Sequence, residues 1–240
     1  MQPFEIIFIL KRMYAQYKYF MKKKYLPLLI PFALLCAFLL FFTGCNKSVN
    51  YLSYVSEKRT NIYLYEDDNV SVKIHCVSRE YPYNADGVCG QINDLIEVFV
   101  TLPKTYNEVE VSLSAGEGEM NYQAVESRYY LSFTAGELKG DSVDVTLTYD
   151  GESKTYSALS VKYAGVMSCD DAVKCVIEHD KTLFENLTQN GLFDGEISVR
   201  LLYDEGCYYY VGVCDKTKHI TAYLIDGERG IVIATKDIQG

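Results

Sequence analysis

Apolar and polar residues alternate along most of residues 55–165, and this pattern constrains the fold more than any other feature of the sequence. A period of two places alternate side chains on opposite faces of a β-strand, so each such run predicts a strand with one buried face. Turn-forming residues such as Gly, Asp and Asn separate several of the runs. The runs lie at residues 61–65, 70–77, 95–102, 109–113, 129–133, 143–149 and 156–161. Seven short strands with this spacing predict an antiparallel β-sandwich over residues 55–165.

The strand pattern of residues 55–165 resembles that of immunoglobulin-like domains, and the resemblance implies two packed antiparallel sheets. The chain contains no Trp, so it lacks the buried Trp that antibody domains carry between their sheets. The resemblance to this group therefore rests on the strand pattern alone.

The hydrophobic period changes from 2 to 3.6 after residue 165. Ser168 and Asp171 have the spacing of a capping box at a helix start, and apolar residues then recur on one helical face. Asn190-Gly191 is a typical helix stop. Alternating runs follow at residues 196–203, 207–214, 220–225 and 231–234. Residues 166–240 are therefore predicted to form a small α+β unit, with one helix packed on an antiparallel meander.

An export signal is predicted near the start of the chain. Lys22 to Lys24 form a positive cluster, residues 26–42 form an uncharged apolar run, and small residues follow at Thr43-Gly44. A positive cluster, an apolar stretch and small residues in this order are typical of signal peptides. Such a signal begins at its own methionine, so Met21 is the expected start of a signal peptide at residues 21–44. Residues 1–20 are then interpreted as a misassigned upstream start.

The sequence Phe42-Thr43-Gly44-Cys45 resembles the bacterial lipobox, in which small residues precede a lipid-modified cysteine. Phe42 stands where the family usually has Leu. The resemblance implies cleavage before Cys45, a diacylglycerol on its thiol, and a lipoprotein held on the outer face of a cell membrane by two acyl chains such as palmitate. Residues 45–54 then form a tether. The alternative is an uncleaved transmembrane anchor at residues 26–42.

The part of the chain after Cys45 is strongly acidic. The whole chain has a net charge of −9, and residues 1–45 contribute +5 from six basic residues and one acidic residue, which leaves −14 for residues 46–240. This charge repels the phosphate backbone of nucleic acids, so nucleic-acid binding is not expected. It favours a cationic partner or serves solubility alone.

Residues 168–237 resemble a PepSY-type domain. The resemblance lies in the helix residues Asp171-Ala172-Val173, the strand Tyr208-Tyr209-Tyr210-Val211, and the closing hairpin at residues 222–232 with its turn at Asp226-Gly227. Such domains occur outside cells and have been proposed to restrain proteases. The resemblance thus implies a protein-contacting unit and supplies no catalytic residues.

Six cysteines follow the predicted lipid site: Cys76, Cys89, Cys169, Cys175, Cys207 and Cys214. An even number in an exported chain favours disulfides, and the simplest pairing stays within each part, such as Cys76 with Cys89. Cys207 and Cys214 point to opposite faces if they share one strand, so each would pair with Cys169 or Cys175. One alternative is buried, reduced thiols. Another is a zinc site with Cys169, Cys175, His179 and Cys207 or Cys214, but no metal is predicted because no Cys-x-x-Cys occurs.

Tyrosine is abundant, with 22 residues, and three stand in a row at Tyr208, Tyr209 and Tyr210. Successive side chains of a strand point to opposite faces, so either Tyr209 or the pair Tyr208 and Tyr210 points outward. An outward ring suits a partner surface, because Tyr combines a flat apolar ring with a polar tip. The alternative is that these rings only fill the strand, since Tyr has a high β propensity.

Motifs for catalysis are absent from the sequence. No nucleophile stands beside a base, and neither Ser-x-x-Lys nor Gly-x-Ser-x-Gly occurs. Glu66-Asp67-Asp68 is interpreted as a solvated turn in preference to a calcium site. We therefore predict no enzyme activity and no cofactor, and a binding or adaptor lipoprotein that contacts an envelope protein. The alternatives are a ligand-binding lipoprotein for a glycan or peptide, and an envelope hydrolase.

Overall fold

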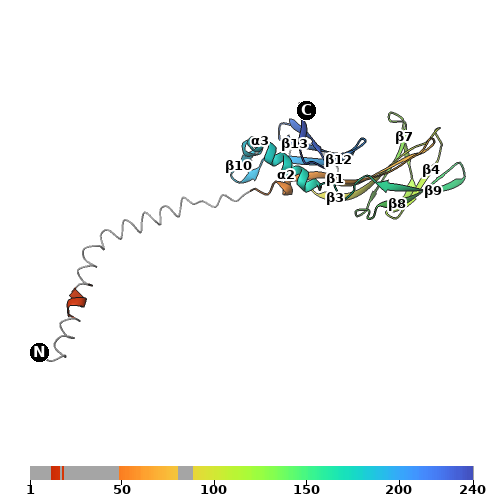
Figure 1. Cartoon of the computed structure of the whole chain (residues 1–240). Coiled ribbons are helices and arrows are strands. Elements are labelled where there is room, and N and C mark those ends of the chain that lie inside the picture. The colour runs from red at the N-terminus through yellow and green to blue at the C-terminus, as the bar shows by residue number, and fades with distance from the viewer. Residues whose placement is uncertain (1–11, 17, 19–48, 81–88, 240) are drawn as a thin grey trace, which may run out of the picture. The chain divides into compact units, whose positions relative to one another are not determined.

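The computed structural model describes residues 12–16, 18, 49–80 and 89–239, and the chain divides into two units, Met1–Ser48 and Val49–Gly240 (Figure 1). The described residues of the first unit are helical. The predicted signal peptide and the predicted lipid site Cys45 lie outside the described residues. In the described part of the chain, no helix is both long and apolar enough to cross a bilayer.

The second unit is built mainly from β-strands, as the period-two pattern predicts. Its described elements are η1 Tyr51–Tyr54, β1 Val55–Glu66, β2 Ser71–Glu80, β3 Ile92–Thr101, β4 Val109–Leu113, β5 Gly116–Glu119, β6 Asn121–Gln123, β7 Arg128–Thr134, β8 Ser142–Tyr149, β9 Glu152–Ser160, α2 Cys169–His179, α3 Lys181–Asn186, β10 Thr188–Gln189, β11 Leu192–Phe193, β12 Gly195–Tyr203, β13 Cys207–Asp215, β14 Ile220–Asp226 and β15 Val232–Ile238. The four strands predicted after the helix correspond to β12 to β15.

Thirteen of the described strands join in one sheet. Its main order is β15-β14-β13-β12-β1-β2-β3-β7-β6, and a second arm, β9-β8-β4-β5, starts from β1. The pairing of β1 with β12 is parallel, and the other pairings in this sheet are antiparallel. Residues 55–66 therefore connect the two parts that the hydrophobic pattern predicts.

The strand β1 forks the sheet. Along one edge it pairs with β2, while along the other edge it pairs first with β12, up to Arg59, and then with β9 at Tyr63 and Leu64. A bulge between Arg59 and Asn61 interrupts the β1–β2 ladder where β1 leaves β12. Bulges re-aim side chains and often lie beside functional sites.

A first core fills the space between the β1-β2-β3-β7 strands and the β9-β8-β4 strands. Ile74 and Ile96 come from one side, Val145 and Leu147 from the other, and all four are fully buried. The strand β5 contacts β7 without pairing with it, so the sheet is curled and nearly closed. The predicted antiparallel strands are confirmed, whereas the immunoglobulin-like description stays a prediction.

A second core lies between α2 and the strands β12, β13 and β14. Ala172 and Val176 of α2 pack with Val199, Tyr209 and other apolar residues of these strands. Figure 1 shows α2 and α3 beside β12 and β13 at one end of this unit, and β4, β7, β8 and β9 at the other end. One face of β12 to β14 is therefore buried under the helix, and no described helix packs on the opposite face.

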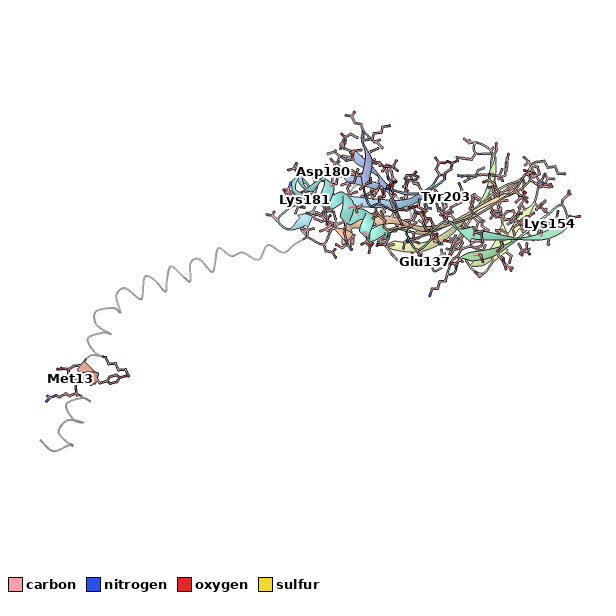
Figure 2. All side chains as sticks on the ribbon, in the orientation of Figure 1. Met13, Glu137, Lys154, Asp180, Lys181 and Tyr203 are labelled. Carbon is pink, nitrogen blue, oxygen red and sulfur yellow. The ribbon has the colours of Figure 1, made fainter. Side chains whose placement is uncertain are left out.

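The prediction of one helix is wrong, because two short helices meet at Asp180, which has φ −127° and ψ 62°. The Asp180 carboxylate accepts from the Leu183 backbone N–H at 3.0 Å and from the Tyr223 hydroxyl at 2.9 Å. This carboxylate caps α3 and ties the break to β14. Figure 2 labels Asp180 at this break. The predicted helix start is confirmed, since Ser168 Oγ accepts from the Asp171 backbone N–H at 3.1 Å.

Candidate functional site

The strand β13 divides the three consecutive tyrosines between two faces of the sheet. Tyr209 is 0% exposed, packs in the second core, and donates from its hydroxyl to the Met167 carbonyl at 2.6 Å. Burial raises the pKa of the Tyr209 hydroxyl, which therefore stays a donor at neutral pH. Tyr208 and Tyr210 are half-buried and, by strand alternation, point to the face opposite α2. Of the two predicted arrangements, the structure thus places Tyr208 and Tyr210 outward.

Tyr210 lies close against its own strand and contacts Arg200 of β12. The two residues are cross-strand partners, and the guanidinium carbon of Arg200 lies 5.6 Å from the Tyr210 ring centroid. This distance is that of a cation–π contact. Gly212 makes room for the ring, because a Cβ there would lie 2.7 Å from the Tyr210 hydroxyl oxygen and 2.9 Å from Ser198 Oγ.

An ion pair between Glu57 and Arg200 joins β1 to β12. Arg200 Nε donates to Glu57 Oε2 at 2.7 Å, and Arg200 Nη2 lies 2.5 Å from the same oxygen. The Glu57 side chain is 3% exposed, whereas that of Arg200 is 33% exposed. A carboxylate buried this deeply needs a cation beside it, so this pair is a fixed part of the surface.

A second ion pair joins β2 to β3. Arg79 Nη2 donates to Glu97 Oε1 at 2.8 Å, and the Tyr130 hydroxyl donates to the same oxygen at 3.2 Å. His75 Nδ1 lies 3.8 Å from Glu97 Oε2, beyond hydrogen-bond distance. Burial opposes ionisation of Glu97, but the neighbouring polar groups of His75, Arg79 and Tyr130 outweigh it and lower the pKa of Glu97 below its ordinary value.

Aromatic contacts extend this surface to β7. The Phe99 ring centroid lies 4.9 Å from that of His75 and 5.2 Å from that of Tyr130. The guanidinium carbon of Arg128 lies 4.4 Å from the Phe99 centroid. Burial lowers the pKa of His75 below its ordinary value of 6.5, so the imidazole between these rings is neutral at pH 7.

Arg59 lies between the two ion pairs, at the fork of the sheet. Its Nη1 reaches the Leu201 carbonyl at 3.5 Å, and its buried Nε has no hydrogen-bond partner among the described residues. No ion pair joins Arg59 to a carboxylate in the described part of the chain. Burial lowers the pKa of Arg59, against the attraction of Glu57 and together with the repulsion of Arg200.

These residues form one connected surface, which we call the arginine–tyrosine face. Its members are Glu57, Arg59, His75, Arg79, Glu97, Phe99, Arg128, Tyr130, Arg200, Tyr208 and Tyr210. It holds four of the five arginines that follow Cys45. The eleven named residues carry +2 from four arginines and two glutamates, whereas residues 46–240 as a whole carry −14. Strand alternation also puts Glu196 and Asp226 on this side of the sheet. The named residues are therefore more positive than the rest of the acidic chain.

Among the described residues, no disulfide joins the six cysteines that follow the predicted lipid site, and their pairing stays a prediction. Cys76 lies in the first core, whereas the Cys89 thiol lies beside the Val55 carbonyl at 3.7 Å. Burial raises the pKa of Cys76 to about 11. Cys207 lies in the core under α2, and Cys214 does not belong to that core.

Cys169 and Cys207 are the two cysteines that share their surroundings. Both are buried in the second core, where the Cys169 thiol contacts the Arg59 carbonyl and the Cys207 thiol contacts the Val161 carbonyl, each at 3.3 Å. Both thiols act on the pKa of Tyr209, after the larger effect of burial. Burial raises the pKa of Cys169 to about 11, so this thiol is protonated at neutral pH. Of the predicted partners for Cys207, Cys169 shares its core, and the pairing stays a prediction.

The other polar motifs have local contacts. His179, one residue of the zinc alternative, meets the Tyr223 ring edge-on at 6.2 Å between centroids. Over residues 49–80 and 89–239, no three His, Cys, Asp or Glu side chains gather as a metal site would require. The Asp67 carboxylate accepts from the backbone N–H groups of Asn69 and Val70 at 2.8 Å and 2.7 Å. These bonds and the Tyr65 hydroxyl lower the pKa of Asp67 and stabilise the turn.

An open pocket of about 770 Å³ lies where η1, β1 and the start of β12 meet. Tyr54, Lys58, Cys89, Phe193 and Lys216 are among the residues that line it. The size and the mixture of aromatic and polar groups suit a small ligand or a short peptide segment.

No protein family model, curated protein or solved structure matches this chain. Of the arginine–tyrosine face, the sequence predicts only Tyr208 and Tyr210. The other residues come from β1, β2, β3, β7 and β12, and no motif of consecutive residues marks them. The sequence carried one weak signal: of the five arginines after Cys45, Arg200 falls within an alternating run, and Arg59, Arg79 and Arg128 lie one or two residues outside one.

Proposed function

We propose that this protein is an exported, membrane-anchored lipoprotein without catalytic activity, and that its exposed part binds another envelope protein through the arginine–tyrosine face. The observation that carries the proposal is a half-buried sheet surface that gathers four arginines and has no described helix on it, on a chain that is otherwise strongly acidic. Charge complementarity selects an acidic segment of the partner. The acidic remainder of the chain repels such a segment elsewhere and directs it to this face.

The composition of the face supports protein binding. Arg and Tyr are the residues that most often dominate the binding energy of protein interfaces, especially where they are partly desolvated before binding. Arg79 and Arg200 are held by Glu97 and Glu57, so their side chains lose little freedom when a partner binds. The face is thus preorganised for contact.

The lipobox-like sequence ending at Cys45 supports the anchor, and it places the proposed binding surface outside the cytoplasm. The PepSY-like pattern of residues 168–237 supports a protein-contacting role for the second part of the chain. In this proposal the curled sheet of β1 to β9 acts as an immunoglobulin-like spacer, and β12 to β14 carry the tyrosines of the face.

Site-specific photocross-linking in native membranes tests the proposal. A photoreactive residue replaces Tyr208 in the full chain, and a control replaces Leu159, which is 61% exposed on β9, outside the face. We expect one recurrent partner from position 208, attached through a segment rich in Asp and Glu, and none from position 159. The R128E variant should weaken this cross-link, whereas K174E, whose side chain is 57% exposed on α2, on the other side of the sheet, should not. Cross-linking of the same protein from both positions, or no effect of R128E, would refute the proposed surface.

A ligand-binding lipoprotein for a glycan or peptide is the second candidate, and the 770 Å³ pocket favours it. Tyr54 lines this pocket and its hydroxyl accepts from the Phe193 backbone N–H at 3.3 Å. The test is whether a glycan or peptide raises the Tm of the full chain. If Y54A removed this increase while R128E did not, the pocket would be the binding site in place of the arginine–tyrosine face.

A further inference from the structure

We infer that Arg59 is the centre of a carboxylate-binding site within the arginine–tyrosine face, and that its ligand is an Asp or Glu side chain of the partner protein. This inference rests on the proposed function, because it names the chemistry by which that surface recognises its partner. It starts from the charges that surround Arg59.

Three arginines and two glutamates meet at the fork of the sheet. Arg200 is paired with Glu57, and Arg79 is paired with Glu97. Arg59 is the third cation, and it forms no ion pair with a described carboxylate although it interacts electrostatically with all four of these groups. A half-buried guanidinium without a counter-ion is unfavourable, because burial removes part of its hydration. One further carboxylate would balance the cluster.

The hydrogen-bonding groups of Arg59 point to the same ligand. A guanidinium carries five N–H donors in a planar fork that matches a carboxylate. In the structure, Nη1 makes a long contact of 3.5 Å with the Leu201 carbonyl, and Nε is buried without a hydrogen-bond partner among the described residues. A carboxylate from a partner therefore reaches the two terminal Nη groups, and Nη2 donates to none of the described residues. A bulge follows Arg59, and the pairing of β1 with β12 ends at the same residue. Such an irregularity directs a side chain differently from a regular ladder.

The charge of the cluster selects a carboxylate over a phosphate. Arg59, Arg79 and Arg200 against Glu57 and Glu97 leave a charge of +1, which a single carboxylate neutralises. A phosphate with two negative charges would exceed this charge, and it would lie close to two buried glutamates that repel it. Tyr210, in contact with Arg200, adds an aromatic surface beside the site for the methylene groups of the partner's side chain.

NMR spectroscopy of the full chain in detergent micelles, labelled with ¹⁵N-arginine, tests this inference. Five arginines follow Cys45, so a chain processed at Cys45 gives five Nε–Hε signals, with a sixth from Arg12 if it is unprocessed, and the R59K variant identifies that of Arg59. The probe is an acetylated, amidated hexaglutamate peptide, with the matching hexaglutamine peptide and inorganic phosphate as controls at constant ionic strength. The signal of Arg229, on an exposed turn, reports non-specific ionic effects in the same sample.

We expect a saturable shift of the Arg59 signal with hexaglutamate and none with hexaglutamine. The R59Q and R59K variants should bind hexaglutamate about tenfold more weakly or worse, while R229Q should bind within about twofold of wild type. An unchanged signal of Arg128, which is not among the charges that act on Arg59, would show that the face remains folded in these variants. Equal shifts of Arg59 and Arg229, a shift with hexaglutamine, or saturation by phosphate alone would overturn the carboxylate site. If the cross-link from position 208 persisted while Arg59 did not respond, the proposed function would stand and this inference would fail.

Discussion

The substitution Tyr209→Phe isolates one buried hydrogen bond that ties β13 to the segment before α2. Tyr209 is fully buried, and its hydroxyl donates to the Met167 carbonyl at 2.6 Å. Phe keeps the ring and its packing in the second core, so the variant removes only the hydroxyl. The neighbour Tyr210 provides the matched control, because its ring contacts Arg200 on the opposite face and Tyr210→Phe keeps that ring.

The expected loss follows from the surroundings of the bond. A buried hydrogen bond contributes roughly 0.5–1.5 kcal/mol net, and a buried carbonyl left without a donor costs roughly 1–3 kcal/mol. Met167 is half-buried, so water reaches part of its surroundings and the lower half of this range applies. We expect Y209F to lose about 1–2 kcal/mol of unfolding free energy. For a folded unit of this size, that corresponds to a decrease in Tm of roughly 2–8 °C.

Thermal unfolding of the full chain in a mild detergent, followed by far-ultraviolet circular dichroism, measures the difference. Circular dichroism suits this protein because the chain has no Trp for fluorescence. The Y210F variant should stay within about 0.5 kcal/mol of wild type. Equal losses in the two variants, or a larger loss in Y210F, would show that the face assignment of the three tyrosines is incorrect.

Two further outcomes are expected. Burial, with Arg59 and Lys73 in the same direction and Glu97 opposing them, lowers the pKa of His75 below 6.5. The unfolded chain therefore binds a proton more readily than the folded chain, so stability is retained above pH 6.5 and falls as the pH drops below it. Between pH 7 and pH 5, wild type should lose more Tm than His75→Gln; parallel curves for the two would contradict this. Intact mass of protein purified from its native membrane should match a chain that starts at Cys45 with a lipid anchor, less two hydrogens for each disulfide; an unlipidated, uncleaved mass would make residues 26–42 a membrane anchor.

The sequence by itself predicts most strands of this protein, because a strand with one buried face requires a period of two within its own residues. The run at residues 70–77 becomes β2, and that at 196–203 becomes β12. The start of α2 is equally local, since the Ser168 side chain bonds to a backbone group three residues away. Strand alternation is also local, and it limits the three tyrosines of β13 to two arrangements: either Tyr209 points outward, or Tyr208 and Tyr210 do.

The break at Asp180 depends on tertiary structure. Apolar residues continue at helical spacing through this position, so the sequence pattern predicts one helix. The Asp180 carboxylate instead accepts from the hydroxyl of Tyr223, 43 residues later in β14. No local pattern shows a contact of this kind, because the partner is brought close only when the meander packs on the helix.

The arginine–tyrosine face depends still more on the fold. Arg59 and Arg200 are cross-strand neighbours only because β1 pairs in parallel with β12, about 140 residues along the chain. Strand periodicity indicates which side chains of one strand share a face, but it does not indicate which strands pair. That choice depends on how both cores are buried at once, with α2 on one side of β12 to β14 and the curled sheet around the other core. The sequence therefore determined the strands and the two possible directions of the tyrosines, while the tertiary structure decided that four distant arginines meet on one surface.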